Sequence, residues 1–466
     1  MNILKPILDF YRTSAPAEPL EQTPEQQQRY YRKLGLQAFT AATLGYSLYY
    51  VCRTSLNVMK KPILDSGMLD ATQLGVIGST LFFAYAVGKF VNGFVGDYCN
   101  IKKFMATGLI LSALANLVMG LTGLLSGWAA VTSTSIFIIC AVVWGINGWA
   151  QSMGAPPAII SLSRWFPLKR RGTFYGFFSA SHNLGEFFSY LFVGQIVAVA
   201  GWQWGFFGST IAGAIGIIII VLFLHDNPES KGLPPVEVLA HEQKTPQSDS
   251  SVKEIQRQVL RTPAVWILAA ASAFMYISRY SLNSWGVLFL QEQKGFDTAD
   301  ATFIISINAL LGIVGTVLSG WISDSLFKGN RNIPAFISGV LLTLSYAMFI
   351  YGGDSYFINV LSMVIFGIAI GVLICFIGGL MAVDIVPRKA TGAALGIVGL
   401  ASYVAAGIQD VVSGALIDGS ITETVNELGE AVRHYDFSHA ALFWIGSSVI
   451  SFLLPILNWR RKVKEE

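Results

Sequence analysis

Charged residues are scarce in this chain of 466 residues. They make up 13% of the sequence, whereas hydrophobic residues make up 53%, and the mean hydropathy is +0.56. Soluble globular domains carry charge on about 25% of their residues, so this composition excludes an ordinary soluble protein and predicts many membrane-spanning segments. The net charge of +3 is too small to indicate a nucleic-acid partner.

The sequence also lacks the motifs of metal, redox and nucleotide chemistry. Its four cysteines have none of the paired spacings that zinc or redox motifs require. The absence of a G-x-x-x-x-G-K-[ST] loop argues against an ATP-driven pump. Because no nucleophile elbow or pair of catalytic carboxylates occurs in a loop of useful length either, we expect no enzymatic activity, no metal and no cofactor.

Long apolar runs take the place of these motifs. Twelve runs can be placed, each of the roughly 20 residues that a helix needs to cross a bilayer. They lack the period-two alternation of barrel strands, so the predicted fold is all-α with twelve transmembrane helices. The runs begin near Leu34, Thr72, Lys103, Val131, Gly172, Trp204, Pro263, Ala299, Pro334, Phe357, Thr391 and Phe437.

Basic residues gather in alternate loops, which the positive-inside rule places in the cytoplasm. The opposite loops are short and nearly uncharged, apart from Lys60, Lys61, Lys294 and an acidic stretch from Asp418 to Asp436. No signal peptide is apparent, and an even number of spans returns the chain to its starting side. We therefore expect a multi-pass protein of the cell (inner) membrane with both termini in the cytoplasm.

The spans divide into two groups of six. The predicted order is a cytoplasmic N-terminal segment, a six-helix bundle, a polar cytoplasmic linker, a second six-helix bundle and a cytoplasmic tail. These parts cover residues 1–33, 34–224, 225–262, 263–459 and 460–466.

The two halves repeat each other. R-x-S-L-N occurs at Arg53 and again at Arg279, 226 positions later, and Asp97 and Asp324 end similar glycine-containing runs 227 positions apart. Two pseudo-symmetric bundles that rock about a site between them form a known transporter architecture.

Arg53 and Arg279 are the most informative residues of the chain. An arginine at the bilayer centre costs about 2.5 to 3.5 kcal/mol on insertion scales, and two at matched positions indicate a dianion. Planar guanidinium groups grip phosphate oxygens bidentately, so we interpret the pair as a phosphate clamp. The alternative is that each arginine snorkels to the interface.

Other polar residues of the spans are candidates for the same site. Lys89 adds a fixed charge, and His182 would gain a proton as an anion approached, although a lone histidine is more often a packing residue. Tyrosines supply candidate hydroxyl groups for binding the substrate, although any one of them could instead be an interfacial aromatic. They are Tyr46, Tyr50, Tyr85, Tyr276 and Tyr403.

Four acids are assigned to gating or charge balance. We expect Asp97 and Asp324 to lie within reach of basic loop residues such as Lys102, Lys103 and Arg331. There the two acids would act either as gates or as static topology anchors. Glu186 and Asp410 lie inside the fifth and eleventh spans, where they would either pair with Lys89 or an arginine or be held protonated by desolvation. Our hypothesis is that they balance the cavity charge when substrate leaves. The alternative for both is a water-exposed polar lining.

Several motifs together resemble the organophosphate:inorganic phosphate antiporters of the major facilitator superfamily. They are G-Y-S-L-Y-Y-V-C-R from Gly45, Y-A-V-G-K-F from Tyr85, Q-S-M-G-A-P-P from Gln151, R-R-G-T-F-Y-G-F from Arg170, S-H-N-L-G from Ser181, D-N-P-E-S-K-G-L-P-P from Asp226, Y-I-S-R-Y from Tyr276 and G-W-I-S-D-S-L-F-K-G-N-R from Gly320. The resemblance implies the major facilitator fold, with phosphate-binding arginines at Arg53 and Arg279 and cavity residues at Lys89, His182 and the five tyrosines. It further implies exchange of inorganic phosphate for a phosphate ester by a rocker-switch motion.

The chain departs from that family at three places. Its tenth span reads G-V-L-I-C-F from Gly371 without a proline, Glu186 replaces a residue that is generally small, and Leu395 and Val398 stand where hexose-phosphate members have an Asp and Lys pair. These changes bear on the organic part of the substrate, for which R-R-G-T-F favours hexose 6-phosphate, with glycerol 3-phosphate next. We expect a monomer.

One alternative function remains open. Transporter-like receptors of the same family bind a sugar phosphate and signal to a partner histidine kinase, with the same arginines. A proton-driven exporter of apolar compounds is disfavoured, because two fixed cations in the cavity would repel cationic drugs.

Overall fold

The computed structural model describes residues 4–125, 132–239, 259–327, 330–386, 391–425 and 431–459. The predicted tail at 460–466 and the middle of the predicted linker, 240–258, lie outside these residues. Asp97 and Asp324 lie in described helices, but their side chains are outside the description, so the gating hypothesis for these two acids stays a prediction.

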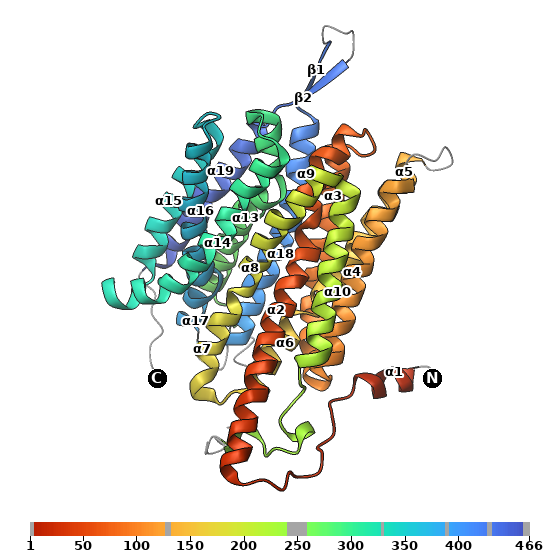
Figure 1. Cartoon of the computed structure of the whole chain (residues 1–466). Coiled ribbons are helices and arrows are strands. Elements are labelled where there is room, and N and C mark those ends of the chain that lie inside the picture. The colour runs from red at the N-terminus through yellow and green to blue at the C-terminus, as the bar shows by residue number, and fades with distance from the viewer. Residues whose placement is uncertain are drawn as a thin grey trace.

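Two helical bundles lie side by side (Figure 1). The N-terminal half contains α2 (Pro24–Asp65), α3 (Ala71–Tyr98), α4 (Ile101–Leu125), α5 (Ser133–Gln151), α6 (Ala155–Trp165), α7 (Leu168–Ser179), α8 (Ser181–Phe188), η1 (Ser189–Val193), α9 (Gly194–Ala200) and α10 (Trp202–Phe223). The C-terminal half contains α13 (Pro263–Lys294), α14 (Thr298–Trp321), η3 (Ile322–Leu326), α15 (Asn332–Tyr351), α16 (Tyr356–Cys375), η4 (Phe376–Leu380), α17 (Met381–Asp384), α18 (Thr391–Asp418), α19 (Ser438–Leu453) and η6 (Leu454–Asn458).

Short elements flank the bundles. A helix, α1 (Leu4–Tyr11), precedes them, and η2 (Glu229–Lys231) and α11 (Val236–Leu239) follow α10. An antiparallel hairpin of β1 (Ile421–Val425) and β2 (Ala431–Tyr435) connects α18 to α19. The hairpin lies in the acidic stretch that we expected to be a plain loop.

The predicted membrane helices are present. In the described ranges, eleven helical segments are long and apolar enough to cross a membrane. A further helix, α2, is long enough at 42 residues to cross the membrane, but charged residues such as Arg53, Lys60 and Lys61 reduce its hydropathy. It begins at Pro24, earlier than the predicted Leu34, because Thr23 caps its first turn and Gln26 completes a capping box.

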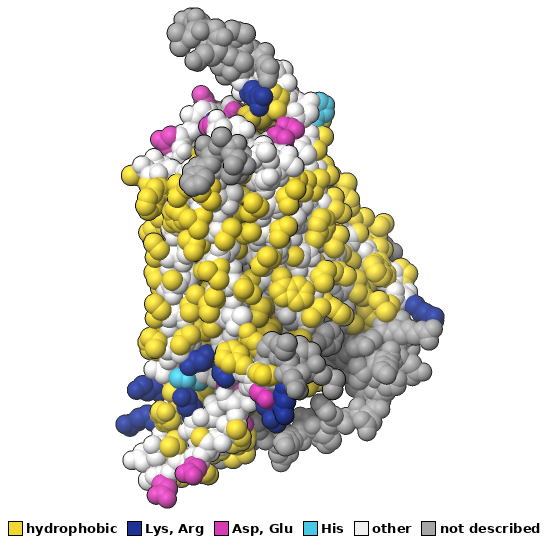
Figure 2. Space-filling view, turned by 90° about the vertical axis from the view of Figure 1, so that its right-hand side faces the viewer, with side chains coloured by type: hydrophobic (Ala, Val, Ile, Leu, Met, Phe, Trp, Pro, Cys, Tyr) yellow, Lys and Arg dark blue, Asp and Glu magenta, His cyan; other side chains and the backbone are white. Residues whose placement is uncertain are grey.

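The two ends of the molecule differ in charge. We call the end that carries both chain termini the terminal face and the end that carries β1 and β2 the hairpin face (Figure 1). On the side of the molecule seen in Figure 2, hydrophobic side chains form a broad band, and most of the visible Lys and Arg side chains lie below it, toward the terminal face. The band has the character expected of a surface in contact with lipid.

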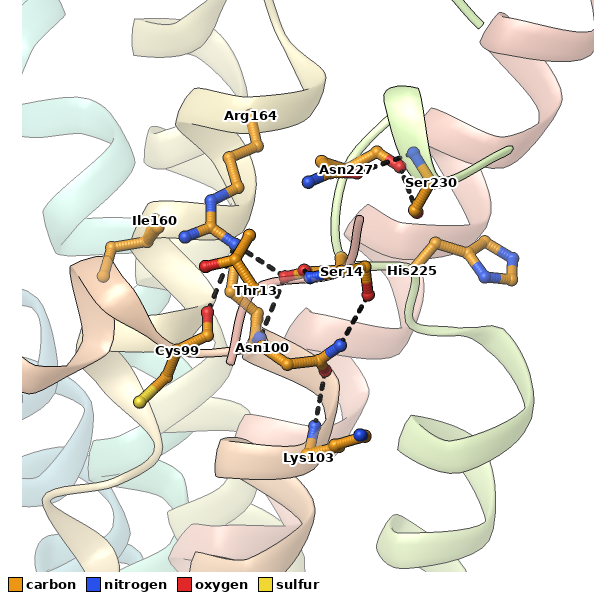
Figure 3. Close-up of polar contacts among 12 residues, drawn as sticks. Thr13, Ser14, Cys99, Asn100, Lys103, Ile160, Arg164, His225, Asn227 and Ser230 are labelled. Atoms are coloured by element: carbon orange, nitrogen blue, oxygen red, sulfur yellow. Dashed lines mark hydrogen bonds and ion pairs between the residues drawn. The ribbon is translucent and has the colours of Figure 1, made fainter. Parts of the chain in front are cut away.

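The segment after α10 is fastened to the N-terminal half. Asp226 is 4% exposed, and its carboxylate accepts from Arg164 Nη1 at 2.6 Å and from the backbone N–H groups of Ser14 and Ile101 at 2.7 and 3.0 Å. Figure 3 shows Arg164, Ser14 and Asn100 converging at this point. Residues 225–239, which we call the docked segment, therefore form a packed start to the predicted linker.

Candidate functional site

A cavity of about 720 Å³ lies between the two halves. It is lined by α2, α3, α6, α7 and α8 of the N-terminal half and by α13, α14, α16, η4 and α18 of the C-terminal half. The structure brings eight of the nine predicted substrate-binding side chains to its wall: Tyr46, Tyr50, Tyr85, Lys89, His182, Tyr276, Arg279 and Tyr403. The ninth, Arg53, lies behind the tyrosines.

Helical spacing explains why these residues meet. On α2, Tyr46, Tyr50 and Arg53 recur at intervals of four and three, which places them on one face of the helix. The same spacing places Tyr276, Arg279 and Asn283 on one face of α13. Since α2 and α13 occupy corresponding places in the two halves, each half presents one arginine and at least one tyrosine toward the other.

Arg53 is enclosed by aromatic rings. Its guanidinium carbon lies 4.3 Å from the ring centre of Tyr85, 5.1 Å from that of Tyr50 and 5.5 Å from that of Tyr403. The ring faces stabilise its charge, yet Nη1 and Nη2 have no hydrogen-bond partner in the part of the chain that the structure describes. At 4% exposure, such donors call for an acceptor other than bulk water.

Arg279 already has an acidic partner. Its Nη2 lies 3.3 and 3.2 Å from Oε1 and Oε2 of Glu186, and Asn283 Nδ2 donates to the same Oε1 at 3.3 Å. Glu186 lies on α8 and Arg279 on α13, so the ion pair crosses between the halves. One of the two pairings that we predicted for Glu186, with an arginine, is therefore observed.

Lys89 and His182 complete the polar wall. Lys89 is exposed to the cavity, and its Nζ lies 5.1 Å from the ring centre of Tyr403. The ring of His182 lies 5.8 Å from that of Tyr50. α3 runs toward the terminal face, and α8 runs away from it (Figure 1).

The cavity is closed toward the hairpin face. Lys60 of α2 and Asp410 of α18 form a fully buried ion pair of 3.2 Å, and Lys60 Nζ lies 3.4 Å from the ring centre of Trp285. Nearby, Lys61 pairs with Glu292, again between the halves. We call the contacts of Lys60, Lys61, Asp410 and Glu292 the hairpin-side seal; the cavity therefore opens toward the terminal face.

Two expectations change at the seal. Lys60 and Lys61 lie in the last turns of α2 rather than in a loop, and Asp410 pairs with Lys60 rather than with Lys89 or an arginine. Sequence reasoning missed Lys60 and Trp285. The available signal was spacing, since Lys60 follows Arg53 by seven residues and therefore shares its helix face.

The basic loop residues have other partners at the terminal face. Arg331 Nη1 lies 2.9 Å from Asp384 Oδ2, and Lys103 Nζ donates to the backbone carbonyl of Phe10 at 2.9 Å. We had expected both residues to lie within reach of Asp97 or Asp324, and these contacts neither test nor require such a gate.

Known proteins are similar to this chain in sequence and in fold. A model of the Major Facilitator Superfamily matches residues 42–409. The chain is 31% identical to a glycerol-3-phosphate transporter of Bacillus subtilis, over 94% of this chain and 95% of that protein. It is 32% identical to a probable hexose phosphate transport protein of Chlamydia muridarum, over 82% and 85%.

Two further matches bear on function and fold. The chain is 30% identical to the membrane sensor protein UhpC of Salmonella typhimurium, over 86% of this chain and 90% of that protein. A bacterial homolog of the human lysosomal transporter Spinster aligns with a TM-score of 0.68 at 17% identity, over 94% of this chain and 99% of that one, which supports the fold alone.

Proposed function

The chain belongs to the Major Facilitator Superfamily, and we propose that it exchanges inorganic phosphate for an organic phosphate ester across the membrane. Its relatives are named as transporters and a sensor, not as enzymes. Hexose 6-phosphate is the favoured ester and glycerol 3-phosphate the next, in keeping with the names of the transporters that the chain resembles.

The unpartnered guanidinium of Arg53 carries the proposal. Buried N–H donors without acceptors are rare in proteins, and Nη1 and Nη2 of Arg53 have none among the described residues. The oxygens of a phosphate group, placed between Arg53 and Arg279, would accept from both guanidinium groups. The hydroxyls of the cavity tyrosines would then bind the rest of the ester.

Charge balance supports a dianion. With His182 counted as neutral, Arg53, Lys89 and Arg279 supply three positive charges and Glu186 one negative charge, a net charge of +2. A phosphate dianion neutralises this sum, whereas a neutral sugar leaves it uncompensated.

The closed seal and the open terminal face support a mechanism of alternating access. We propose that the terminal face is cytoplasmic, that both termini lie in the cytoplasm, and that the structure is the inward-facing state of a monomer. Residues 34–224 and 263–459 would act as the two rocking bundles, joined by the linker. Breaking the hairpin-side seal and closing the terminal side would present the same arginines to the outside.

A sensor is the second candidate, because the chain is also similar to the membrane sensor protein UhpC. A receptor would bind the same sugar phosphate and use it to shift a conformational equilibrium, passing the signal to a partner histidine kinase. Its arginine clamp would not differ from that of a transporter.

Proteoliposomes that contain the purified protein and radiolabelled phosphate separate the two candidates. A transporter exchanges internal label for external phosphate, glucose 6-phosphate or glycerol 3-phosphate, and a pure sensor exchanges none. Phosphoglycerate and phosphoenolpyruvate complete the panel and identify the ester. Binding of glucose 6-phosphate without any exchange would support the sensor and contradict the transporter.

A further inference from the structure

The ion pair of Glu186 with Arg279 joins the two halves at the depth of the cavity. The two side chains are 1% and 5% exposed, so water screens their attraction only weakly. Glu186 follows His182 by one helical turn on α8, on the side of the site that leads to the hairpin face. The carboxylate therefore contacts Arg279 from behind while Arg279 also lines the cavity.

Neighbouring hydrogen bonds strengthen this connection. Tyr190 of η1 donates its hydroxyl to the backbone carbonyl of Asn283 at 2.5 Å, and Asn283 donates its side-chain amide to Glu186. Tyr190 and Glu186 belong to the N-terminal half and Asn283 to the C-terminal half. The contacts of Glu186 thus connect the two halves, and one of the groups in this connection is Arg279, a predicted substrate-binding residue.

Arg53 has no such competitor. In the described structure its Nη atoms contact no acceptor, whereas Arg279 Nη2 is shared by both oxygens of a carboxylate. Once the surrounding tyrosines admit it, an anion would meet no competing protein acceptor at Arg53, but it must compete with Glu186 for Arg279.

We propose that Glu186 acts as an internal substitute for the substrate phosphate, holding Arg279 in the empty carrier so that the empty carrier does not reorient. This inference rests on the proposed exchange function. Phosphate and carboxylate are both oxyanions that accept from guanidinium N–H groups. When phosphate bridges Arg53 and Arg279, it takes over the N–H donors that Glu186 used, and the connection between the halves through Glu186 is released.

Obligatory exchange is the consequence. A carrier that returns empty would have to break the buried pair of Glu186 with Arg279 without replacement, which leaves two uncompensated charges at buried positions. A loaded carrier breaks the same pair with phosphate already in place. Only the loaded carrier then reorients readily, which is the property that distinguishes an exchanger from a uniporter.

The pair of Lys60 with Asp410 provides a matched comparison. It is also buried and also joins the halves, but neither residue lines the cavity, so a substrate does not compete for it. It must break during reorientation of both the empty and the loaded carrier. Removal of the pair of Lys60 with Asp410 should therefore change the reorientation rates of the empty and the loaded carrier alike.

The test compares two rates in proteoliposomes loaded with radiolabelled phosphate. One is exchange for external phosphate, and the other is net efflux into phosphate-free buffer. We expect Glu186→Gln to raise the ratio of net efflux to exchange at least about tenfold over wild type, because the conformational barrier specific to the empty state is removed. The double variant Lys60→Met, Asp410→Asn should leave this ratio within about twofold of wild type. An unchanged ratio in Glu186→Gln would overturn the inference.

Phosphate affinity of the purified protein gives a second readout that does not depend on transport. Removal of a competitor strengthens phosphate binding, whereas removal of a residue that merely orients Arg279 weakens it. We expect Glu186→Gln to bind inorganic phosphate about tenfold more tightly than wild type, and an equal or weaker affinity contradicts the inference. If wild type shows no exchange at all, the proposed function fails, and this binding measurement still decides whether Glu186 competes with the anion.

Discussion

Arg53 and Arg279 occupy matching positions in the two halves, 226 residues apart, yet their surroundings differ. Arg53 is surrounded by the ring faces of Tyr50, Tyr85 and Tyr403, and its Nη atoms reach no acceptor within the described ranges. Arg279 is held by Glu186 from the opposite half. An entering anion therefore meets one arginine without a protein acceptor and one that already holds a carboxylate.

Replacing either arginine by lysine tests the clamp. Arg53→Lys and Arg279→Lys keep the charge but remove the planar pair of donors. Since each hydrogen bond to a charged group contributes about 1.5 to 3 kcal/mol, we expect kcat/KM for phosphate exchange to fall at least about tenfold in each variant. The matched control is Arg433→Lys, at an exposed position of β2, which should exchange like wild type. Normal exchange in both cavity variants would exclude a bidentate clamp.

The hairpin-side seal makes a prediction about stability. Asp410→Asn leaves the Lys60 ammonium group buried without a carboxylate, and breaking a buried pair in this way costs about 3 to 5 kcal/mol. We expect a clearly lower melting temperature in detergent for Asp410→Asn. The double variant Lys60→Met, Asp410→Asn should recover most of the loss, because it removes both charges. Equal melting temperatures for the single and double variants would show that the ion pair does not matter for stability.

Close packing of α3 against α18 makes a second prediction about the seal. A Cβ atom at Gly78 would overlap the carboxylate of Asp410, whereas one at Gly446 on α19 meets no atom within 4 Å. Gly78→Val should destabilise the closed seal by about 1 to 3 kcal/mol, and Gly446→Val should not. The readout is the labelling rate of a cysteine introduced at Asn57 by a membrane-impermeant reagent added from the hairpin side. The rate should rise in Gly78→Val only, and an equal rate in both backgrounds would refute the steric argument.

His225, in the docked segment, makes stability depend on pH. Burial lowers the pKa of His225 from 6.5 to about 4, and the charges of Lys231 and Lys102 act in the same direction. The folded form therefore binds the proton more weakly than the unfolded chain does, so stability is fully present above pH 6.5 and is lost as pH falls toward 4. We expect the melting temperature of wild type to fall more steeply over this range than that of His225→Gln. Parallel pH profiles would contradict a titration of His225.

Much of the fold follows from local properties of the sequence. The length and hydropathy of the apolar runs predict the membrane helices, because a helix satisfies its own backbone hydrogen bonds in lipid. Helical spacing places Tyr46, Tyr50 and Arg53 on one face before any tertiary contact is known. The start of α2 was misplaced because Thr23 and Gln26 cap a polar first turn, a signal that hydropathy does not record.

The sequence by itself determined the two bundles, the repeat and the identity of the cationic residues, since each of these depends on composition and on spacing along one helix. Only the tertiary structure decided which acid meets which base. Asp410 pairs with Lys60 in the hairpin-side seal and Glu186 with Arg279 at the cavity, although both acids had been expected to serve the cavity. The physical reason is that an ion pair between the bundles forms only where two helices from different halves pass each other at the same depth. The sequence pattern within either helix does not specify that depth.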